Sequence, residues 1–330
     1  MGYELTEEEA CLVALCSTEG VGPATVGRLL EAARAGGRTL EELLALTPAG
    51  LQRETGLAEA LARTVAAIGS PLLAGGSMAD RLRRAGADLL LVGWPEYPDR
   101  LAPCLGTSAP PVLFTLGDAS LLRRKAVGIV GSRRPSREAQ EAARLLASDL
   151  AAAGTVVVSG GAHGIDTAAH RGALEAGATV VLPAMGLMRF QWRGGRSGFD
   201  AEGRWCVVSE FPPHSGWRSA HALLRNRLIV ALSGAVVAFE PRDAGGTWNS
   251  CLHALHMRKP LYIVTCSRRG ARGRALRRLV RMGAAALSPE HMPDAEALGL
   301  LMEDYRPPPS YEQLSLPDAH DRFGVGEGAP

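Results

Sequence analysis

Residues 127–136 read VGIVGSRRPS, and residues 156–166 read VVVSGGAHGID. In both stretches a short apolar run ends in glycine and polar residues, and a helical pattern follows at 136–153 and at 165–176. Continuous apolar runs of this length are typical of strands that are buried on both faces. A strand, a glycine turn and a helix in succession form the repeating unit of α/β folds. The two stretches therefore predict an α/β sheet.

The same pattern continues on both sides of this pair. Further short apolar runs predict strands at 89–92, 112–116, 179–182, 207–209, 235–239 and 261–265. Helical patterns separate many of these runs, including those at 220–232 and 247–257. Strands that alternate with helices predict a parallel sheet with helices on both faces. We therefore expect residues 86–290 to form a doubly wound α/β domain.

The first part of the chain has helical periodicity instead. Thr6 and Glu9 have the spacing of a capping box, which predicts a helix that ends before Gly20-Val21-Gly22-Pro23. Helix, turn and second helix match a helix-hairpin-helix unit, whose turn amides can hold a DNA phosphate. A plain antiparallel helix pair with a tight glycine corner explains the pattern equally well. Residues 1–85 are predicted to form a small all-α domain.

Composition restricts the class of partner and the compartment. The formal net charge is only +2, so affinity for nucleic acid must come from local clusters of arginine. One such cluster lies between Asp243 and Glu290, a segment with nine lysines and arginines and no acidic residue. The six cysteines form no C-x-x-C pair, and the chain shows no signal-peptide pattern or long apolar run. We expect a cytoplasmic protein with reduced thiols, no membrane contact and a largely flexible tail at 291–330.

Three glycine-containing loops follow predicted strands and precede predicted helices. In an open α/β sheet such loops meet at one edge, where helix N-termini and exposed amides bind anions. They supply our candidate phosphate-binding residues, which are Gly131, Ser132, Arg133, Ser159, Gly160, Gly161, His163, Gly164, Ile165, Asp166, Gly246 and Thr247. The loops have neither the G-x-G-x-x-G fingerprint of a dinucleotide site nor the lysine of a P-loop. Because glycine at such turns also serves packing alone, the signal lies in the three loops together.

A fourth candidate segment surrounds the start of the helix at 220–232. Arg225, Asn226 and Arg227 are predicted to bind phosphate, and Trp217 is an aromatic side chain on which a base could stack. The alternative is a solvated helix face with a buried tryptophan.

Groups suited to catalysis or metal binding are scarce. Asp166 lies in a first helical turn, where a carboxylate most often caps backbone amides. His163 is better explained as the donor of one hydrogen bond than as a base. His253 and His256 are three residues apart and have no third metal ligand nearby in sequence. We therefore expect no enzymatic activity, no cofactor and no metal.

With these motifs, the sequence resembles the DNA-processing protein family (DprA/Smf). The resemblance runs from about residue 97 to 265 and rests on an ordered series of motifs: Tyr97-Pro98, Gly131-Ser132-Arg133, Ser159-Gly160, Gly164-Ile165-Asp166, Ala169-His170-Arg171-Gly172, Ser209-Glu210-Phe211-Pro212-Pro213 and Arg225-Asn226-Arg227. It implies an extended Rossmann-like core preceded by a helix-hairpin-helix (SAM-like) domain. It also implies binding of single-stranded DNA, a homodimer, and loading of a RecA-type recombinase during natural transformation, without catalysis.

The chain departs from the family pattern inside the glycine loop. The family usually has arginine at the position of His163 and leucine at the position of Gly161. The loop is therefore expected to hold phosphate mainly through backbone amides, with Arg133 as the chief charge.

Two other functions stay open at this point. One is a phosphoribohydrolase-like enzyme of the same Rossmann-like group, although Asn249 and Ser250 stand where its acid-base glutamate is expected. The other is a sensor that binds a small nucleotide in the same loops. Either would suit a divergent paralogue in another DNA-handling or phage-defence setting.

Overall fold

The computed structural model describes residues 5–191, 203–265 and 270–288. The helices are α1 (Glu7–Ser17), α2 (Pro23–Ala35), α3 (Leu40–Leu44), α4 (Pro48–Thr55), α5 (Glu59–Ala66), α6 (Pro71–Arg84), α7 (Leu101–Leu105), α8 (Arg137–Ala152), α9 (Ile165–Ala176), α10 (Ser219–Leu232), α11 (Gly246–His256) and α12 (Gly270–Arg281). The strands are β1 (Ala87–Leu91), β2 (Val112–Gly117), β3 (Ala126–Gly131), β4 (Val156–Ser159), β5 (Thr179–Val181), β6 (Trp205–Ser209), β7 (Ala235–Phe239), β8 (Leu261–Val264) and β9 (Ala285–Leu287).

The N-terminal region is helical, as predicted, and its helix starts follow from local chemistry. At α1 the Glu9 amide donates to Thr6 Oγ1 at 3.3 Å, and the Thr6 amide donates to Glu9 Oε2 at 2.8 Å. This reciprocal pair is the capping box expected from the sequence. Proline opens α2, α4 and α6, where its missing amide hydrogen leaves no bond unmade. The role of the turn between α1 and α2 as a DNA grip stays a prediction.

All the strands form one sheet, in the order β1-β2-β6-β5-β4-β3-β7-β8-β9. The pairs from β6 through β9 are parallel, which confirms the predicted doubly wound arrangement. The expectation of a wholly parallel sheet is wrong at one end, because β2 is antiparallel to both β1 and β6. Antiparallel strands at the edge of a parallel sheet are common, and an apolar run does not reveal its own direction.

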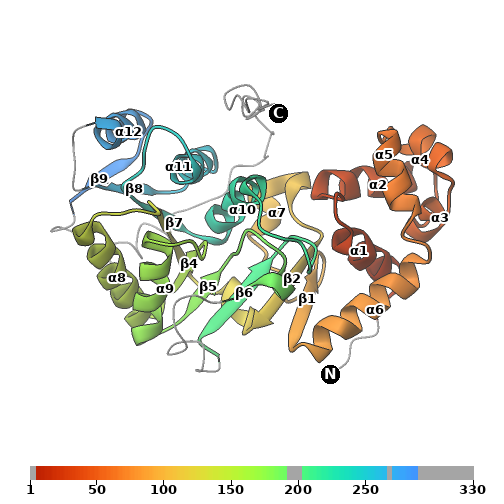
Figure 1. The fold of residues 1–330 in the computed structure, drawn as a ribbon, viewed down its shortest axis with the longest axis horizontal. Helices are drawn as coiled ribbons and strands as arrows, with labels where there is room; N and C mark the ends of the chain where they lie inside the picture. The colour runs from red at the N-terminus through yellow and green to blue at the C-terminus, as the bar shows by residue number, and fades with distance from the viewer. Residues whose placement is uncertain (1–4, 192–202, 266–269, 289–330) are drawn as a thin grey trace, which may run out of the picture.

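Helices cover both faces of this sheet (Figure 1). On one face α8 and α9 pack on β3, β4 and β7 through residues such as Val127, Val157 and Val237. Farther along the same face, the helices α1–α6 share a core with β1, β2, Val181 and Val207. The opposite face carries α7, α10, α11 and α12. The N-terminal helices thus complete one layer of the sheet, and the domain boundaries at 85/86 and 290/291 stay predictions, with 291–330 outside the described residues.

The described residues include five cysteines, all without a disulfide. Cys11, Cys16, Cys104, Cys206 and Cys251 are free and buried. None of the helices in the described ranges is both long and apolar enough to cross a membrane. Burial raises the pKa of the Cys16 thiol to about 12, so this group is an unreactive part of the core.

The strand order reverses direction between β3 and β7, which are adjacent although a long segment separates them in the chain. From β3 the sheet grows through β4, β5 and β6 on one side and through β7, β8 and β9 on the other. Loops at the carboxyl ends of β3 and β7 therefore diverge to opposite faces and leave a crevice between them. In open α/β sheets this crevice is where ligands bind.

Close backbone contact between α1 and α6 generates a stability prediction. A Cβ atom at Gly75 would lie 1.9 Å from the Ala10 carbonyl oxygen, whereas a Cβ at Gly76 would have nothing within 4 Å. We expect Gly75→Ala to destabilise the fold by about 1–3 kcal/mol, because the two helices must separate. Gly76→Ala should stabilise it by up to about 1 kcal/mol through helix propensity. Urea unfolding of both variants measures the difference, and equal effects would contradict this packing.

Candidate nucleic-acid interface

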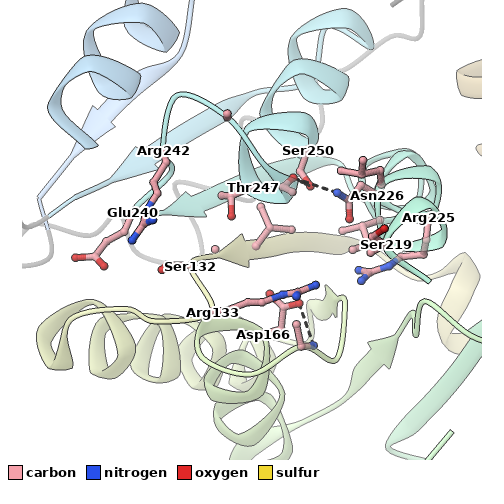
Figure 2. Close-up of a pocket in the computed structure, with 18 of the residues that line it drawn as sticks. Ser132, Arg133, Asp166, Ser219, Arg225, Asn226, Glu240, Arg242, Thr247 and Ser250 are labelled. Atoms are coloured by element: carbon pink, nitrogen blue, oxygen red, sulfur yellow. Dashed lines mark hydrogen bonds between the residues drawn. The ribbon is translucent and has the colours of Figure 1, made fainter. Parts of the chain in front are cut away.

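A cavity of about 510 Å³ lies in the crevice between β3 and β7. Its walls come from the loop after β3, the first turn of α9, the first half of α10, and the loop from β7 into α11 (Figure 2). Three of the predicted loops therefore meet in space, as the sheet topology requires.

The loop after β3 is held by backbone hydrogen bonds to β7 and to the start of α9. The Ser132 amide donates to the Phe239 carbonyl at 3.1 Å, and the Ser132 carbonyl accepts from the Ile165 amide at 3.2 Å. A Cβ atom at Gly131 would lie 2.5 Å from the Ile165 side chain, so only glycine permits this approach. The exposed Arg133 side chain projects from this fixed loop and lines the cavity.

The glycine loop between β4 and α9 contributes little surface to the cavity. Its glycines instead allow neighbouring groups to pack closely against the backbone. A Cβ at Gly160 would lie 1.9 Å from the Arg225 guanidinium, and Gly164, at φ +85°, would bring one 2.4 Å from the Ser132 carbonyl. Ala162 and Asp166 line the cavity. Gly161 and His163 are exposed outside its lining, and buried Ser159 donates to the Ile129 carbonyl at 2.5 Å.

Asp166 accepts a hydrogen bond from a backbone amide of this loop, but it does not cap α9, whose N-cap residue is Gly164. The Ala162 amide donates to its Oδ2 at 3.2 Å. Burial raises the pKa of the Asp166 carboxyl, and the nearby Arg225 charge opposes that rise. Asp166 is thus a buried acid close to two arginines, Arg225 and Arg133.

Arg225 is the buried cation of the cavity. Only 6% of its surface is exposed, and its Nε has no hydrogen-bond partner in the described parts of the chain. Burial lowers the pKa of Arg225 to about 10, with Asp166 opposing and Arg133 adding to the shift. The guanidinium therefore keeps its charge at neutral pH. A buried guanidinium that lines a cavity is suited to binding an anion.

Asn226 ties α10 to the third loop. Its Nδ2 donates to the Gly246 carbonyl at 3.0 Å and to Asn249 Oδ1 at 3.1 Å. These bonds place Gly246 and Thr247, at the start of α11, in the cavity wall opposite Ser132 and Arg133 (Figure 2). The N-terminus of α11 adds a positive dipole end to this wall.

Arg227 is not brought into the cavity. It is buried and forms an ion pair with buried Glu210, which follows β6. Residues two apart on a helix point to nearly opposite sides, so Arg225 and Arg227 cannot share one ligand site. Burial raises the pKa of the Glu210 carboxyl, while the Arg227 charge opposes the rise. This placement gives Arg227 a role in joining α10 to β6.

Five polar residues of the cavity wall were not among the candidate residues chosen from the sequence: Arg134, Ser219, Glu240, Arg242 and Ser250. Arg242 is one of the exposed residues of this set. The position of Arg242, three residues beyond the predicted strand at 235–239, was the signal that could have found it.

Glu240 is one of the acidic residues that occupy arginines of the basic segment between Asp243 and Glu290. These arginines are therefore less available to a polyanion than the composition of the segment suggests. Buried Glu240 has φ +49°, and its Oε2 accepts from the Ser136 amide at 3.0 Å and from Arg272 at 2.8 Å. Arg274 pairs with Asp243 at 2.8 Å, and Arg278 lies 4.6 Å over the Trp248 ring. Three arginines of α12 are therefore engaged by the structure next to the cavity, and Arg277 and Arg281 of the same helix are exposed. No group of three or more potential metal ligands occurs within the described residues.

Sequence comparisons relate the chain to one protein family. The model of the family described as DNA recombination-mediator protein A matches residues 88–295. The DNA processing protein DprA of Bacillus subtilis is 28% identical over 208 residues, which are 62% of this chain and 69% of that protein. DprA of Streptococcus pneumoniae is 32% identical over 158 residues, 47% of this chain and 56% of that protein.

Solved structures give the same result for the fold. The structure of Streptococcus pneumoniae DprA has a TM-score of 0.65 at 23% identity, covering 87% of this chain and 97% of that one. Helicobacter pylori DprA, solved to study its single-stranded DNA binding mode, has a TM-score of 0.55 at 26% identity, covering 67% and 97%. Because the family model spans more than half of its residues, the chain belongs to the DNA recombination-mediator protein A family, also called DprA/Smf.

Proposed function

We propose that the chain binds single-stranded DNA, with backbone phosphates entering the cavity between β3 and β7. The observation that carries this proposal is Arg225, a buried guanidinium that lines the same cavity as exposed Arg133. Phosphate is an anion that a guanidinium fork binds well. The Helicobacter pylori relative, whose single-stranded DNA binding mode is described, supports the same ligand.

The proposal extends to the partners that family membership suggests. The chain would act in the cytoplasm as a homodimer that loads a RecA-type recombinase onto single strands, in transformation or recombination. It would do so without catalysis. A test is RecA filament formation on a strand coated with single-strand-binding protein, which the chain should accelerate.

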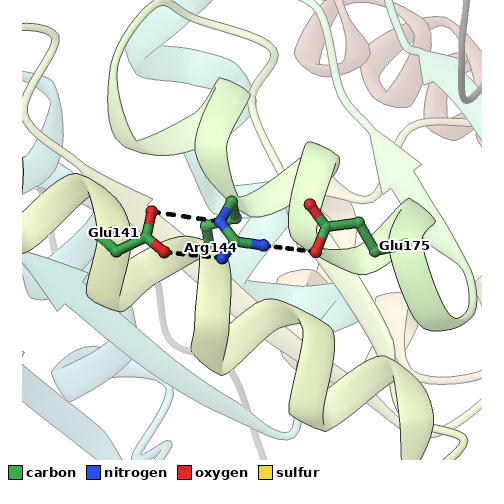
Figure 3. Close-up of polar contacts among 3 residues, drawn as sticks. All are labelled: Glu141, Arg144 and Glu175. Atoms are coloured by element: carbon green, nitrogen blue, oxygen red, sulfur yellow. Dashed lines mark hydrogen bonds and ion pairs between the residues drawn. The ribbon is translucent and has the colours of Figure 1, made fainter.

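Salt dependence separates strand binding from recognition of one nucleotide. Arg133→Ala should weaken binding of an oligothymidine about tenfold and flatten the slope of log K against log salt by ~0.7 per lost phosphate contact. The matched control is Arg144→Ala, because Arg144 already pairs with Glu141 at 2.7 Å and Glu175 at 2.5 Å (Figure 3). Fluorescence anisotropy across a salt series measures both quantities. Tighter binding of a free nucleotide than of the strand would contradict the proposal.

Substitution of Arg225 should mainly reduce DNA affinity, whereas substitution of Arg227 should mainly reduce the stability of the fold. Arg225→Lys retains the charge but loses the planar fork, so strand affinity should fall roughly 10- to 100-fold with a small change in stability. Arg227→Met should leave Glu210 buried without its partner, which costs about 3–5 kcal/mol of unfolding free energy. The double variant Arg227→Met and Glu210→Leu should recover most of that stability and bind DNA normally. A binding defect in this double variant would show that Arg227 contacts the strand.

A further inference from the structure

Trp217 is an exposed aromatic side chain at the cavity. It lies in the segment between β6 and α10, 51% of its surface is exposed, and it contributes to the cavity lining. The Arg133 guanidinium carbon lies 5.7 Å from the centre of its ring. An aromatic face and a phosphate-binding arginine therefore stand side by side.

Trp248 shows what a structural tryptophan looks like in the same fold. It is 8% exposed, belongs to the core beneath α11, and is covered by Arg278 at 4.6 Å. Leaving a large aromatic ring half open to water forgoes much of the stabilisation that burial supplies. Trp217 lacks this stabilisation, and its ring lies at a cavity beside a cation, where a ligand could cover it.

The segment that carries Trp217 is anchored on both sides. Phe211 stacks on His221 with ring centres 4.1 Å apart, and the Ser215 amide donates to the Pro212 carbonyl at 2.8 Å. Next to Trp217, Arg218 pairs with Glu19 at the end of α1, and His214 is bonded to Arg81 of α6 at 2.8 Å. These contacts hold the backbone on either side of Trp217, which reduces the part of the ordering cost of binding that comes from this segment.

We propose that Trp217 forms a nucleobase subsite, in which one base of the strand stacks on the indole while an adjacent phosphate lies at Arg133. The inference rests on the proposed function and adds the side chain that holds a base. A base adjoining a phosphate combines a flat apolar face with an anion, and the indole and guanidinium match these two parts. Because every base has such a face, the subsite would tolerate any sequence.

Substitution of Trp217 tests the proposal through affinity. Trp217→Ala should weaken binding of oligothymidine about 5- to 100-fold, and Trp217→Phe should retain most of the affinity. The salt slope should stay that of the parent in both variants, since no phosphate contact is lost. Leu73→Ala, which removes a 76%-exposed apolar side chain on α6, is the control and should have no effect. Parent affinity in Trp217→Ala would overturn the subsite.

An abasic strand provides a second, independent measurement. The parent should bind a strand of abasic sugar-phosphate units more weakly than oligothymidine, and Trp217→Ala should show a smaller difference between the two. Tryptophan emission of the parent should also be quenched by oligothymidine more than that of Trp217→Phe. If the parent binds oligothymidine more tightly than the abasic strand and Trp217→Ala shows the same difference in affinity, the subsite lies elsewhere. If the parent binds neither strand, the proposed function itself fails.

Discussion

The backbone of Ser132 is the link on which the cavity depends. Its amide donates to Phe239 at the end of β7, and its carbonyl accepts from Ile165 at the start of α9. One residue therefore joins the loops that follow β3, β4 and β7. Gly131 and Gly164 are required on either side of this link, because a Cβ at either position would overlap Ile165 or Ser132. The arginines and amides of the site keep their spacing because the backbone beneath them cannot shift independently.

Two buried ion clusters on α10 serve different ends. Arg227 has a direct carboxylate partner in Glu210, so its charge is used inside the protein and helps to hold α10 on the sheet. Arg225 interacts with Asp166 without a direct ion pair, since the Asp166 carboxylate is turned to the Ala162 amide. Removing an ion from water is expensive unless its hydrogen bonds are replaced. At Arg225 the Nε atom makes no such bond within the described residues, so on the proposed function a bound phosphate would offset part of the cost of burying this charge.

The sequence was sufficient for the sheet and for the meeting of the loops, because apolar runs and glycine turns are local signals with a fixed geometric consequence. It was insufficient where the outcome depends on direction or on distant partners. Arg225 and Arg227, two residues apart, look alike in sequence, and only the helix phase separates the cavity residue from the buried partner of Glu210. The arginines of α12 look like a surface for polyanions, but Glu240 and Asp243, distant in the linear pattern, engage Arg272 and Arg274. The short strand β9 and the antiparallel direction of β2 likewise leave no local signature.

On the proposed function, the same geometry favours a single strand over a duplex. The net charge of +2 gives little long-range attraction, and at physiological salt the field of exposed charges is screened beyond ~8 Å. Binding must therefore come from groups that the strand reaches directly. Exposed Arg133 is accessible to any phosphate, but Arg225 is buried, so a phosphate must enter the cavity to contact it. A flexible strand can bend inward and turn a base toward Trp217, whereas a duplex keeps its bases stacked on each other and its backbone stiff. On this proposal, the preference for a single strand over a duplex follows from the burial of the Arg225 charge.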